Sequence, residues 1–160
     1  MHVLITGGTG FIGRALCLRL ADAGHRLSVL TRDPSAAVRR LPPGTRVVAD
    51  LAEIEEAVDG VVNLAGENLG SGRWTAVRRQ RFLDSRVQLT RRLVDWMATR
   101  PPAVLVNGSA IGYYGVRGDE IVTEADPPGT VLQGGLDICS DWENEAMRAE
   151  AHGVRVCRLR

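Results

Sequence analysis

Thr6-Gly7-Gly8-Thr9-Gly10-Phe11-Ile12-Gly13 joins an apolar run, residues 3–5, to a segment with helical periodicity, residues 12–23. The glycines have the spacing GxxGxxG, which suits a tight turn, close approach of the backbone to a diphosphate, and close helix–strand packing. The N-terminus of the helix would present free N–H groups and a positive dipole end to the phosphates. A strand, a glycine turn and a helix in this order predict a dinucleotide site. The residues expected to contact the ligand here are Gly7, Thr9, Gly10, Phe11, Ile12 and Gly13.

Short apolar runs alternate with helical patterns along the rest of the chain. We expect helices at residues 12–23, 34–38, 51–58, 75–99 and 135–151, and strands at residues 3–5, 27–30, 47–49, 61–64, 104–106 and 154–159. Residues 115–135 lack periodicity and predict a long loop. Strands that are apolar on both faces and alternate with helices predict an α/β fold. We expect a Rossmann-type, doubly wound parallel sheet with helices on both faces, in three layers.

The composition narrows the function classes. Twenty basic residues against 19 acidic ones give a formal charge of +1, which does not favour nucleic acid or an acidic membrane as a partner. No run of about 18 apolar residues is present, so no membrane-spanning helix is expected. Cys17, Cys139 and Cys157 are widely spaced and odd in number, which is typical of reduced core residues in a cytoplasmic protein. No histidine has metal-ligand spacing, so no metal is predicted.

The end of the second strand decides between two cofactors. An acidic residue there binds the ribose 2′-hydroxyl of NAD, whereas an arginine accommodates the 2′-phosphate of NADP. The sequence offers Arg32 next to Asp33. Asp33 precedes Pro34 and is expected to be the N-cap of a short helix. Arg32 therefore remains as the phosphate contact, and we predict NADP; a solvated surface arginine is the alternative.

Two further strand ends supply candidate contacts with the dinucleotide. Asp50 follows the third strand, and Leu64, Ala65 and Gly66 follow the fourth. Ligands of open α/β sheets bind at the carboxyl ends of strands. Asp50 is in place to accept from the adenine amino group, and the small residues let the dinucleotide pass over the sheet edge. A helix cap at Asp50 and simple turn residues at 64–66 are equally good interpretations.

The motifs together resemble a known superfamily, the extended short-chain dehydrogenases/reductases. More narrowly, they resemble its atypical branch of NAD-dependent epimerase/dehydratase-like (epimerase family) oxidoreductases. The motifs are TGGTGFIG at 6–13, NLAGENL at 63–69, GRW at 72–74, SRVQLT at 85–90, SAIGYYG at 109–115 and CSDWE at 139–143. The resemblance implies that residues 1–160 are an NAD(P)-binding Rossmann domain, with a smaller substrate domain in the portion of a longer protein that follows.

The resemblance also implies a catalytic serine and a Tyr/Lys pair. Ser109 matches the serine that polarises the substrate; a local turn bond is its alternative role. Gly135 falls where the tyrosine is expected and Cys139 where the lysine is expected, and the chain contains no lysine at all. An asparagine of the preceding helix aligns with Arg86. A tyrosine without a cationic neighbour has a pKa of about 10 and is a poor base near neutral pH.

Substitutes for the missing pair are available in the sequence. Tyr113 or Tyr114 lies four or five residues past Ser109 and is a candidate acid facing the nicotinamide, with packing at the cleft wall as an equal alternative. Cys139 shares a helical face with Gly135, Trp142, Ala146 and Ala149, which we interpret as a packing face. The arginines of residues 78–92 alternate with apolar residues at core spacing, which predicts a solvated face with one or two arginines toward a ligand.

Two functions from different classes follow. The first is hydride transfer between NADPH and a small carbonyl or nucleotide-sugar-like substrate by the full-length protein, with Ser109 and Tyr113 at the reacting oxygen. The second is an NADP(H)-binding sensor or interaction protein without turnover, favoured by the missing Tyr/Lys pair. The exposed surface of the sixth strand also predicts pairing of two copies or low stability.

Overall fold

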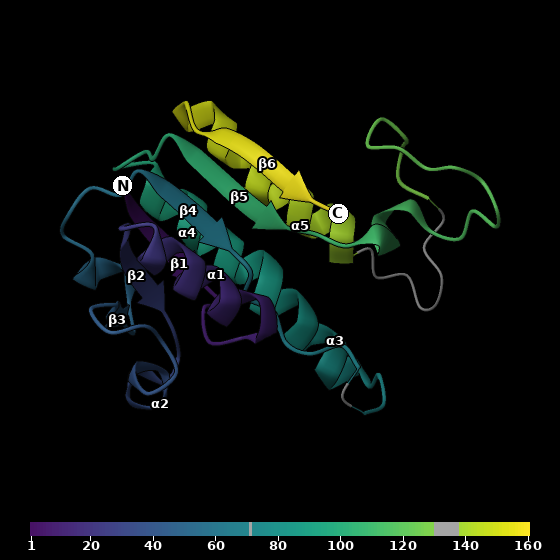
Figure 1. Cartoon of the computed structure of the whole chain (residues 1–160). Helices are drawn as coiled ribbons and strands as arrows, with labels where there is room; N and C mark the ends of the chain where they lie inside the picture. The colour runs from purple at the N-terminus through teal and green to yellow at the C-terminus, as the bar shows by residue number, and fades with distance from the viewer. Residues whose placement is uncertain (71, 130–137) are drawn as a thin grey trace.

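The computed structural model describes residues 1–70, 72–129 and 138–160. Its strands form a parallel sheet in the order β3-β2-β1-β4-β5-β6 (Figure 1). All six strands expected from the apolar runs are present, and each is within two residues of the expected ends. They are β1 (His2–Thr6), β2 (Arg26–Leu30), β3 (Arg46–Val48), β4 (Gly60–Asn63), β5 (Val104–Gly108) and β6 (Arg155–Leu159).

The strand order creates a crevice between two neighbouring strands. From β1 the chain moves outward through β2 to β3, and then returns to the other side of β1 as β4. Thr6 pairs with Leu30 on one side and with Asn63 on the other, so the three strands end at the same level. The segments that follow β1 and β4 diverge to opposite sides, and this reversal point is where open α/β sheets bind ligands. The glycine loop and residues 64–66 both lie there.

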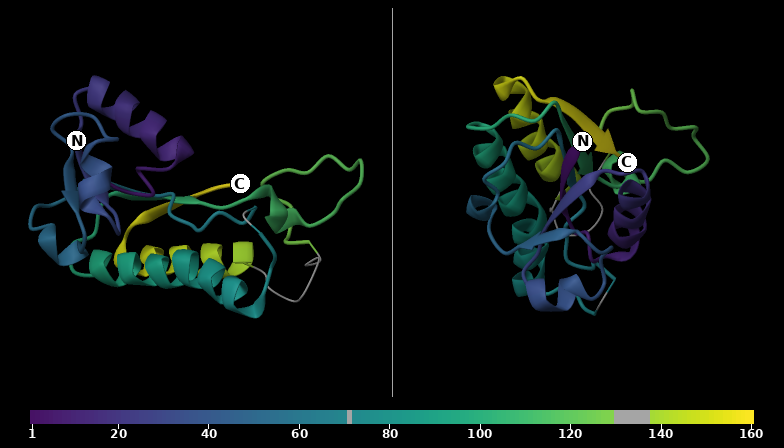
Figure 2. Two further views of the ribbon diagram at one scale, coloured as in Figure 1. Left: turned by 90° about the horizontal axis from the view of Figure 1, so that it is seen from below. Right: turned by 60° about the vertical axis from the view of Figure 1, so that its left-hand side comes forward.

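Helices cover both faces of the sheet and complete three layers (Figure 2). One face carries α1 (Phe11–Asp22) and α2 (Pro34–Val38), and the other carries α4 (Leu89–Met97) and α5 (Ile138–Met147). A helix α3 (Ala76–Leu83) continues through a π-helical segment, Asp84–Gln88, into α4. Figure 1 shows that α3 extends past the carboxyl end of β4. The predicted Rossmann-type fold is confirmed.

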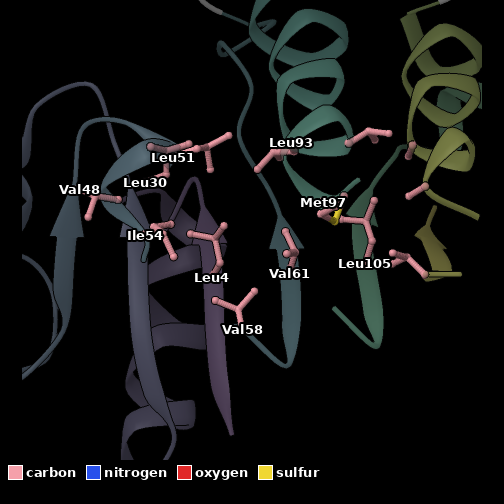
Figure 3. Packing of buried hydrophobic residues seen from close by; sticks show 14 residues of the cluster. Leu4, Leu30, Val48, Leu51, Ile54, Val58, Val61, Leu93, Met97 and Leu105 are labelled. Atoms are coloured by element: carbon pink, nitrogen blue, oxygen red, sulfur yellow. The ribbon is translucent and has the colours of Figure 1, made fainter. Parts of the chain in front are cut away.

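The larger core cluster lies between the sheet and the helices α4 and α5. Leu93 and Met97 of α4 point toward Leu4, Val61 and Leu105 of the three central strands (Figure 3). Residues four apart on a helix share one face, so both α4 side chains are fully buried. A smaller cluster on the other face combines strand residues with α1 and α2: Val3, Ile5, Cys17, Leu27, Val29, Ala37 and Leu41.

The helix predicted at residues 51–58 is wrong. The structure has only a 3-10 turn, Leu51–Glu53, after which the chain is extended. The apolar residues that suggested the helix are buried, but Arg100 donates to the carbonyl oxygens of Ile54 and Glu55, each at 2.8 Å. A distant arginine therefore binds two carbonyl oxygens of this irregular segment, a contact that periodicity alone does not reveal.

The other expected helices are present with modified ends. The segment predicted as 75–99 runs from Ala76 to Met97 with the π-helical segment in its middle. The segment predicted as 135–151 begins at Ile138 among the described residues and ends in a 3-10 turn, Arg148–His152. Gly24 has a φ of +77° just past α1, as a helix-ending glycine should. Residues 115–129 of the expected long loop contain no helix or strand.

Cys17, Cys139 and Cys157 form no disulfide among the described residues, and only Cys17 belongs to the core. Cys139 and Cys157 are half-buried. Val156 packs on the larger core cluster, so its neighbour Cys157 points to the opposite face, where its partner Val106 is also half-buried. Within residues 1–70, 72–129 and 138–160, no helix is long and apolar enough to cross a membrane.

Candidate functional site

The glycine loop is shaped by contacts that leave no room for side chains. Gly7 has a φ of +69°, and a Cβ there would lie 2.6 Å from the carbonyl carbon of Leu64. A Cβ on Gly13 would lie 2.2 Å from the carbonyl oxygen of Gly7. Gly10 donates its N–H to that same oxygen at 2.9 Å and forms the N-cap of α1 without a side-chain cap. The first-turn N–H groups of α1 are therefore left for a ligand, as an anion site requires.

A cleft of about 690 Å³ opens beside this loop at the carboxyl edge of the sheet. Seven of the eleven predicted cofactor contacts line it: Gly7, Thr9, Gly10, Arg32, Leu64, Ala65 and Gly66. Phe11, Ile12, Gly13 and Asp50 do not. Gly13 has a packing role against Gly7, and the side chains of Phe11 and Ile12 are exposed on α1. The sequence therefore predicts the side of the cleft that is formed by the glycine loop and the ends of β2 and β4.

The opposite wall was not predicted. It comes from α3, the π-helical segment and α4, which contribute Arg81, Asp84, Ser85, Gln88, Leu89 and Arg92. Residues 81, 85, 88 and 92 follow one another at steps of four, three and four, so they share one helix face. Polar residues at this spacing were the sequence feature from which this wall could have been predicted. Two arginines of the 78–92 series thus face the cleft, as the periodicity predicted, while Arg91 and Arg78 pair with Glu145 and Glu67.

Arg32 and Asp33 take the separate positions that the sequence predicts. The Asp33 carboxylate accepts from the Ala36 N–H at 2.9 Å and from the Ser35 hydroxyl at 3.0 Å, and so caps α2. These hydrogen bonds lower the pKa of Asp33. Arg32 lines the cleft beside Thr31 at the end of β2. Its side chain forms no hydrogen bond or ion pair with any residue that the structure describes, so its guanidinium donors are available to a ligand.

Asp50 has the helix-cap role that was one of its two interpretations. Its side chain accepts from the Ala52 N–H at 2.9 Å. The Glu53 carboxylate accepts from the Asp50 N–H at 2.8 Å, which completes a capping box. The second carboxylate oxygen accepts from Arg92 at 3.1 Å. The adenine contact proposed for Asp50 stays a prediction, and the pair with Arg92 links the end of β3 to the α4 wall.

Ser109 lies just past β5, and its hydroxyl proton is already engaged. It donates to the Glu143 carboxylate at 2.6 Å. Glu143 is 2% exposed and also accepts from Arg160 at 2.7 and 2.8 Å and from Arg158 at 3.2 Å. Burial raises the pKa of Glu143, but the bonds from Arg160 and Ser109 and the charges of both arginines outweigh it and hold this pKa below its usual range. Ser109 can therefore only accept a hydrogen bond from a ligand in this state.

Both tyrosines near Ser109 are held by the same arginine. The Arg160 guanidinium lies 3.7 Å from the ring centroid of Tyr113 and donates to the Tyr114 hydroxyl at 3.0 Å. Tyr114 is buried, and Tyr113 is half-buried. Neither tyrosine nor Ser109 lines the cleft of the glycine loop. Tyr114 is therefore a buried packing residue outside this cleft, and the acid role of Tyr113 stays a prediction.

Arg86 fixes the segment that follows β4. It donates to the Glu67 carbonyl oxygen at 3.0 Å, and a Cβ on Gly66 would lie 2.7 Å from its Cζ. Its guanidinium lies 5.4 Å from the ring of Trp142. Burial lowers the pKa of Arg86, while the nearby Cys139 and Glu67 raise it. A side chain at residue 66 would therefore meet the end of the long Arg86 side chain, which would have to shift.

The family follows from a match over nearly the whole chain. Residues 3–160 match the model of the NAD-dependent epimerase/dehydratase family. The chain belongs to this family. An epimerase family protein SDR39U1 homolog from Arabidopsis thaliana, described as chloroplastic, is 37% identical over 171 residues; the match covers 100% of this chain and 48% of that protein. The resemblance expected from the motifs is confirmed.

Solved structures of the epimerase family agree with this assignment. The human epimerase family protein SDR39U1 (isoform 2), solved with NADPH, has a TM-score of 0.74 and 29% identity; the match covers 100% of this chain and 53% of that one. A nucleoside-diphosphate sugar epimerase from Corynebacterium glutamicum has a TM-score of 0.77 and 31% identity, covering 100% of this chain and 33% of that one. The chain spans about half the length of the curated relatives it matches.

The positions that the resemblance sets against the catalytic Tyr/Lys pair are Gly135 and Cys139. Cys139, aligned with the lysine, is a half-buried thiol in the first turn of α5. Gly135, aligned with the tyrosine, lies outside the described residues. Trp142, Ala146 and Ala149 of the same predicted face are buried, so the packing interpretation is confirmed for them. In the described part of the chain, no group of three or more metal-ligating side chains is assembled.

Proposed function

We propose that the chain binds NADP(H) in the cleft at the carboxyl edge of the sheet. The observation that carries this proposal is the separation of Arg32 from Asp33. The carboxylate that would bind a ribose 2′-hydroxyl is used as a helix cap, and the neighbouring guanidinium lines the cleft without a partner among the described residues. NADPH in the human relative's structure supports the same assignment.

The strand order gives the ligand a direction along the cleft. Arg32 follows β2, the glycine loop follows β1, residues 64–66 follow β4 and Ser109 follows β5, and these strands are neighbours in that sequence. A dinucleotide held by Arg32 at its 2′-phosphate and by the α1 N-terminus at its diphosphate would extend toward β4 and β5. Ser109 and Glu143 would then lie on the side of its reacting end.

We propose hydride transfer with a small carbonyl or nucleotide-sugar-like substrate for the whole protein. The bound nicotinamide supplies or accepts the hydride. Ser109, whose proton is donated to Glu143, receives a hydrogen bond from a substrate hydroxyl and so orients the alcohol form of the substrate. Tyr113 lies under the Arg160 guanidinium, which also donates to Glu143. Glu143 acts through Ser109 and is a positioning residue.

A sensor without turnover is the second candidate function. It is favoured by the absence of lysine from the 160 residues and by the engagement of both tyrosines with Arg160. The two functions are separated by NADPH oxidation with a panel of carbonyl substrates, using the full-length protein and its Ser109→Ala variant. Turnover that depends on Ser109 supports the enzyme, and binding of NADPH without oxidation of any substrate supports the sensor.

The cofactor assignment is tested by binding. Titration of cofactor fluorescence should show NADPH bound about 10- to 100-fold more tightly than NADH, the range of one charge-assisted hydrogen-bonded contact. Arg32→Ala should remove most of that preference and leave NADH affinity nearly unchanged. Arg39→Ala, which removes the same charge from the exposed end of α2, should preserve the preference. An Arg32→Ala variant that still prefers NADPH would contradict the assignment.

A further inference from the structure

The wall opposite the glycine loop carries a second cation, Arg81, that has no partner in the part of the chain that the structure describes. We propose that Arg81 binds the diphosphate of the dinucleotide from the side opposite the α1 N-terminus. The inference rests on the proposed function, because it assumes a dinucleotide in this cleft. It assigns the two arginines to different parts of the ligand, Arg32 to the 2′-phosphate and Arg81 to the diphosphate.

The positions of the two walls support this assignment. Gly7, Gly10 and Arg81 all line the same cleft. α1 lies on one face of the sheet, whereas α3 and α4 lie on the other, so a ligand at the switch point lies between them (Figure 2). The helix α3, which contains Arg81, extends past the carboxyl end of β4 (Figure 1). A diphosphate resting on the glycine loop therefore has Arg81 on its open side.

The charges along the cleft leave Arg81 available. Three arginines and two carboxylates line the cleft. Arg92 is paired with Asp50 at 3.1 Å, and Glu67 is paired with Arg78 at 3.6 Å. Asp84 accepts from the Gln80 side-chain amide at 2.9 Å.

The side chain of Arg81 has no hydrogen bond or ion pair with any described residue. Arg32 is the other cleft-lining arginine whose guanidinium has no hydrogen bond or ion pair with residues 1–70, 72–129 and 138–160. Two available cations match a ligand with two separated anionic groups. A dinucleotide phosphate has this distribution, whereas a ligand with one charged group leaves an arginine unused.

The wall that carries Arg81 is anchored to the floor of the cleft. The Ser85 hydroxyl accepts from the Glu67 N–H at 3.0 Å, and Arg86 donates to the Glu67 carbonyl oxygen. Ser85 and Arg86 belong to the π-helical segment, a rare conformation that recurs at functional sites. Arg81 lies one turn before Ser85 on the same face. Its Cα is thus held at a fixed position relative to the residues over which the dinucleotide passes, and only its side chain has to move to meet a phosphate.

The test compares ligands that share or lack each anionic group. Titration calorimetry would measure NADPH, NADH, ADP and adenosine 2′-monophosphate binding to the wild type, Arg81→Ala, Arg32→Ala and Arg19→Ala. Arg19 is an exposed arginine of α1 that does not line the cleft, so its variant controls for the loss of one positive charge. Arg81→Ala should weaken NADPH, NADH and ADP by about the same factor, roughly 10-fold. It should leave adenosine 2′-monophosphate unchanged.

The remaining variants complete the pattern. Arg32→Ala should weaken NADPH and adenosine 2′-monophosphate but not NADH or ADP, and Arg19→Ala should weaken none of them by more than about 2-fold. Unchanged binding of NADPH and NADH by Arg81→Ala would overturn the inference, and so would a loss confined to the two ligands that carry a 2′-phosphate. A wild-type protein that binds neither dinucleotide would instead overturn the proposed function.

Discussion

At the scale of single residues, Glu143 shows how one buried carboxylate organises its surroundings. It is the common acceptor for Ser109, Arg158 and Arg160, and these three residues come from the ends of β5 and β6. A buried charge is tolerated only when it is paired and hydrogen-bonded, and both oxygens of Glu143 satisfy that condition. Because Ser109 donates its hydroxyl proton to Glu143, it can only accept a hydrogen bond from a ligand.

The first prediction concerns the acid limb of stability. The folded state holds the pKa of Glu143 below its ordinary value of about 4.3. Ionised Glu143 therefore stabilises the fold at any pH above that ordinary value, and this stabilisation is lost as the pH falls through the pKa of the folded state. Urea unfolding should show wild-type stability declining below about pH 4.5. Glu143→Gln should be less stable at pH 7 by about 3 kcal/mol and decline less steeply with acid. Glu150→Gln, which removes an exposed carboxylate shortly after α5, should lose stability in acid as steeply as the wild type. If Glu143→Gln also did so, Glu143 would not be the source of the acid dependence.

At the scale of elements, a buried polar network connects the sheet to the helices of one face. Asn63 of β4 accepts from the Thr6 hydroxyl at 2.6 Å and donates to Asn107 of β5 at 2.6 Å and to Thr90 of α4 at 2.8 Å. Trp142 of α5 donates to the same Thr90 hydroxyl at 2.9 Å. The oxygen of Thr90 is therefore the point at which β4, α4 and α5 meet.

The second prediction removes that oxygen. Thr90→Val keeps the shape of the side chain but leaves one N–H of the Asn63 amide and the Trp142 indole N–H without their acceptor. Each buried donor without a partner costs about 1–3 kcal/mol, so chemical denaturation should show a loss of at least that size. Thr90→Ser should retain most of the stability, and Thr99→Val, at an exposed hydroxyl after α4, should change it by less than about 0.5 kcal/mol. A neutral Thr90→Val variant would show that the network does not hold α4 and α5 in place.

At the scale of the whole molecule, the cleft gathers residues from both halves of the sheet. Leu30 and Arg32 come from the β2 side, Leu64 and Gly66 from the β4 side, and Gln88 and Arg92 from the helical wall. A ligand bound there contacts segments that are remote in sequence, so its binding energy adds to the stability of the entire fold. The measurable consequence is a rise in melting temperature.

The third prediction is the size of that rise. NADPH at 100 times its dissociation constant adds about 2.7 kcal/mol to the folded state, and for a chain of 160 residues this corresponds to about 5–10 °C. A thermal melt with NADPH should show this shift, and NADH at the same concentration should give a smaller one. Arg32→Ala should reduce the NADPH shift to that of NADH. A melting temperature that does not respond to NADPH would contradict binding by these 160 residues.

Local sequence determined the six strands, the glycine turn and the split between Arg32 and Asp33. Apolar runs, glycine spacing and capping chemistry act over a few neighbouring residues, so the structures that they form can be predicted without the fold. Only the tertiary structure decided that residues 54–58 are irregular, with two carbonyl oxygens bound by Arg100, and that Ser109 gives its proton to Glu143, 34 residues away. The α3–α4 wall with Arg81 also depends on the strand order, which brings a helix face opposite the glycine loop. Contacts between distant residues are fixed by packing, and packing is a property of the folded chain.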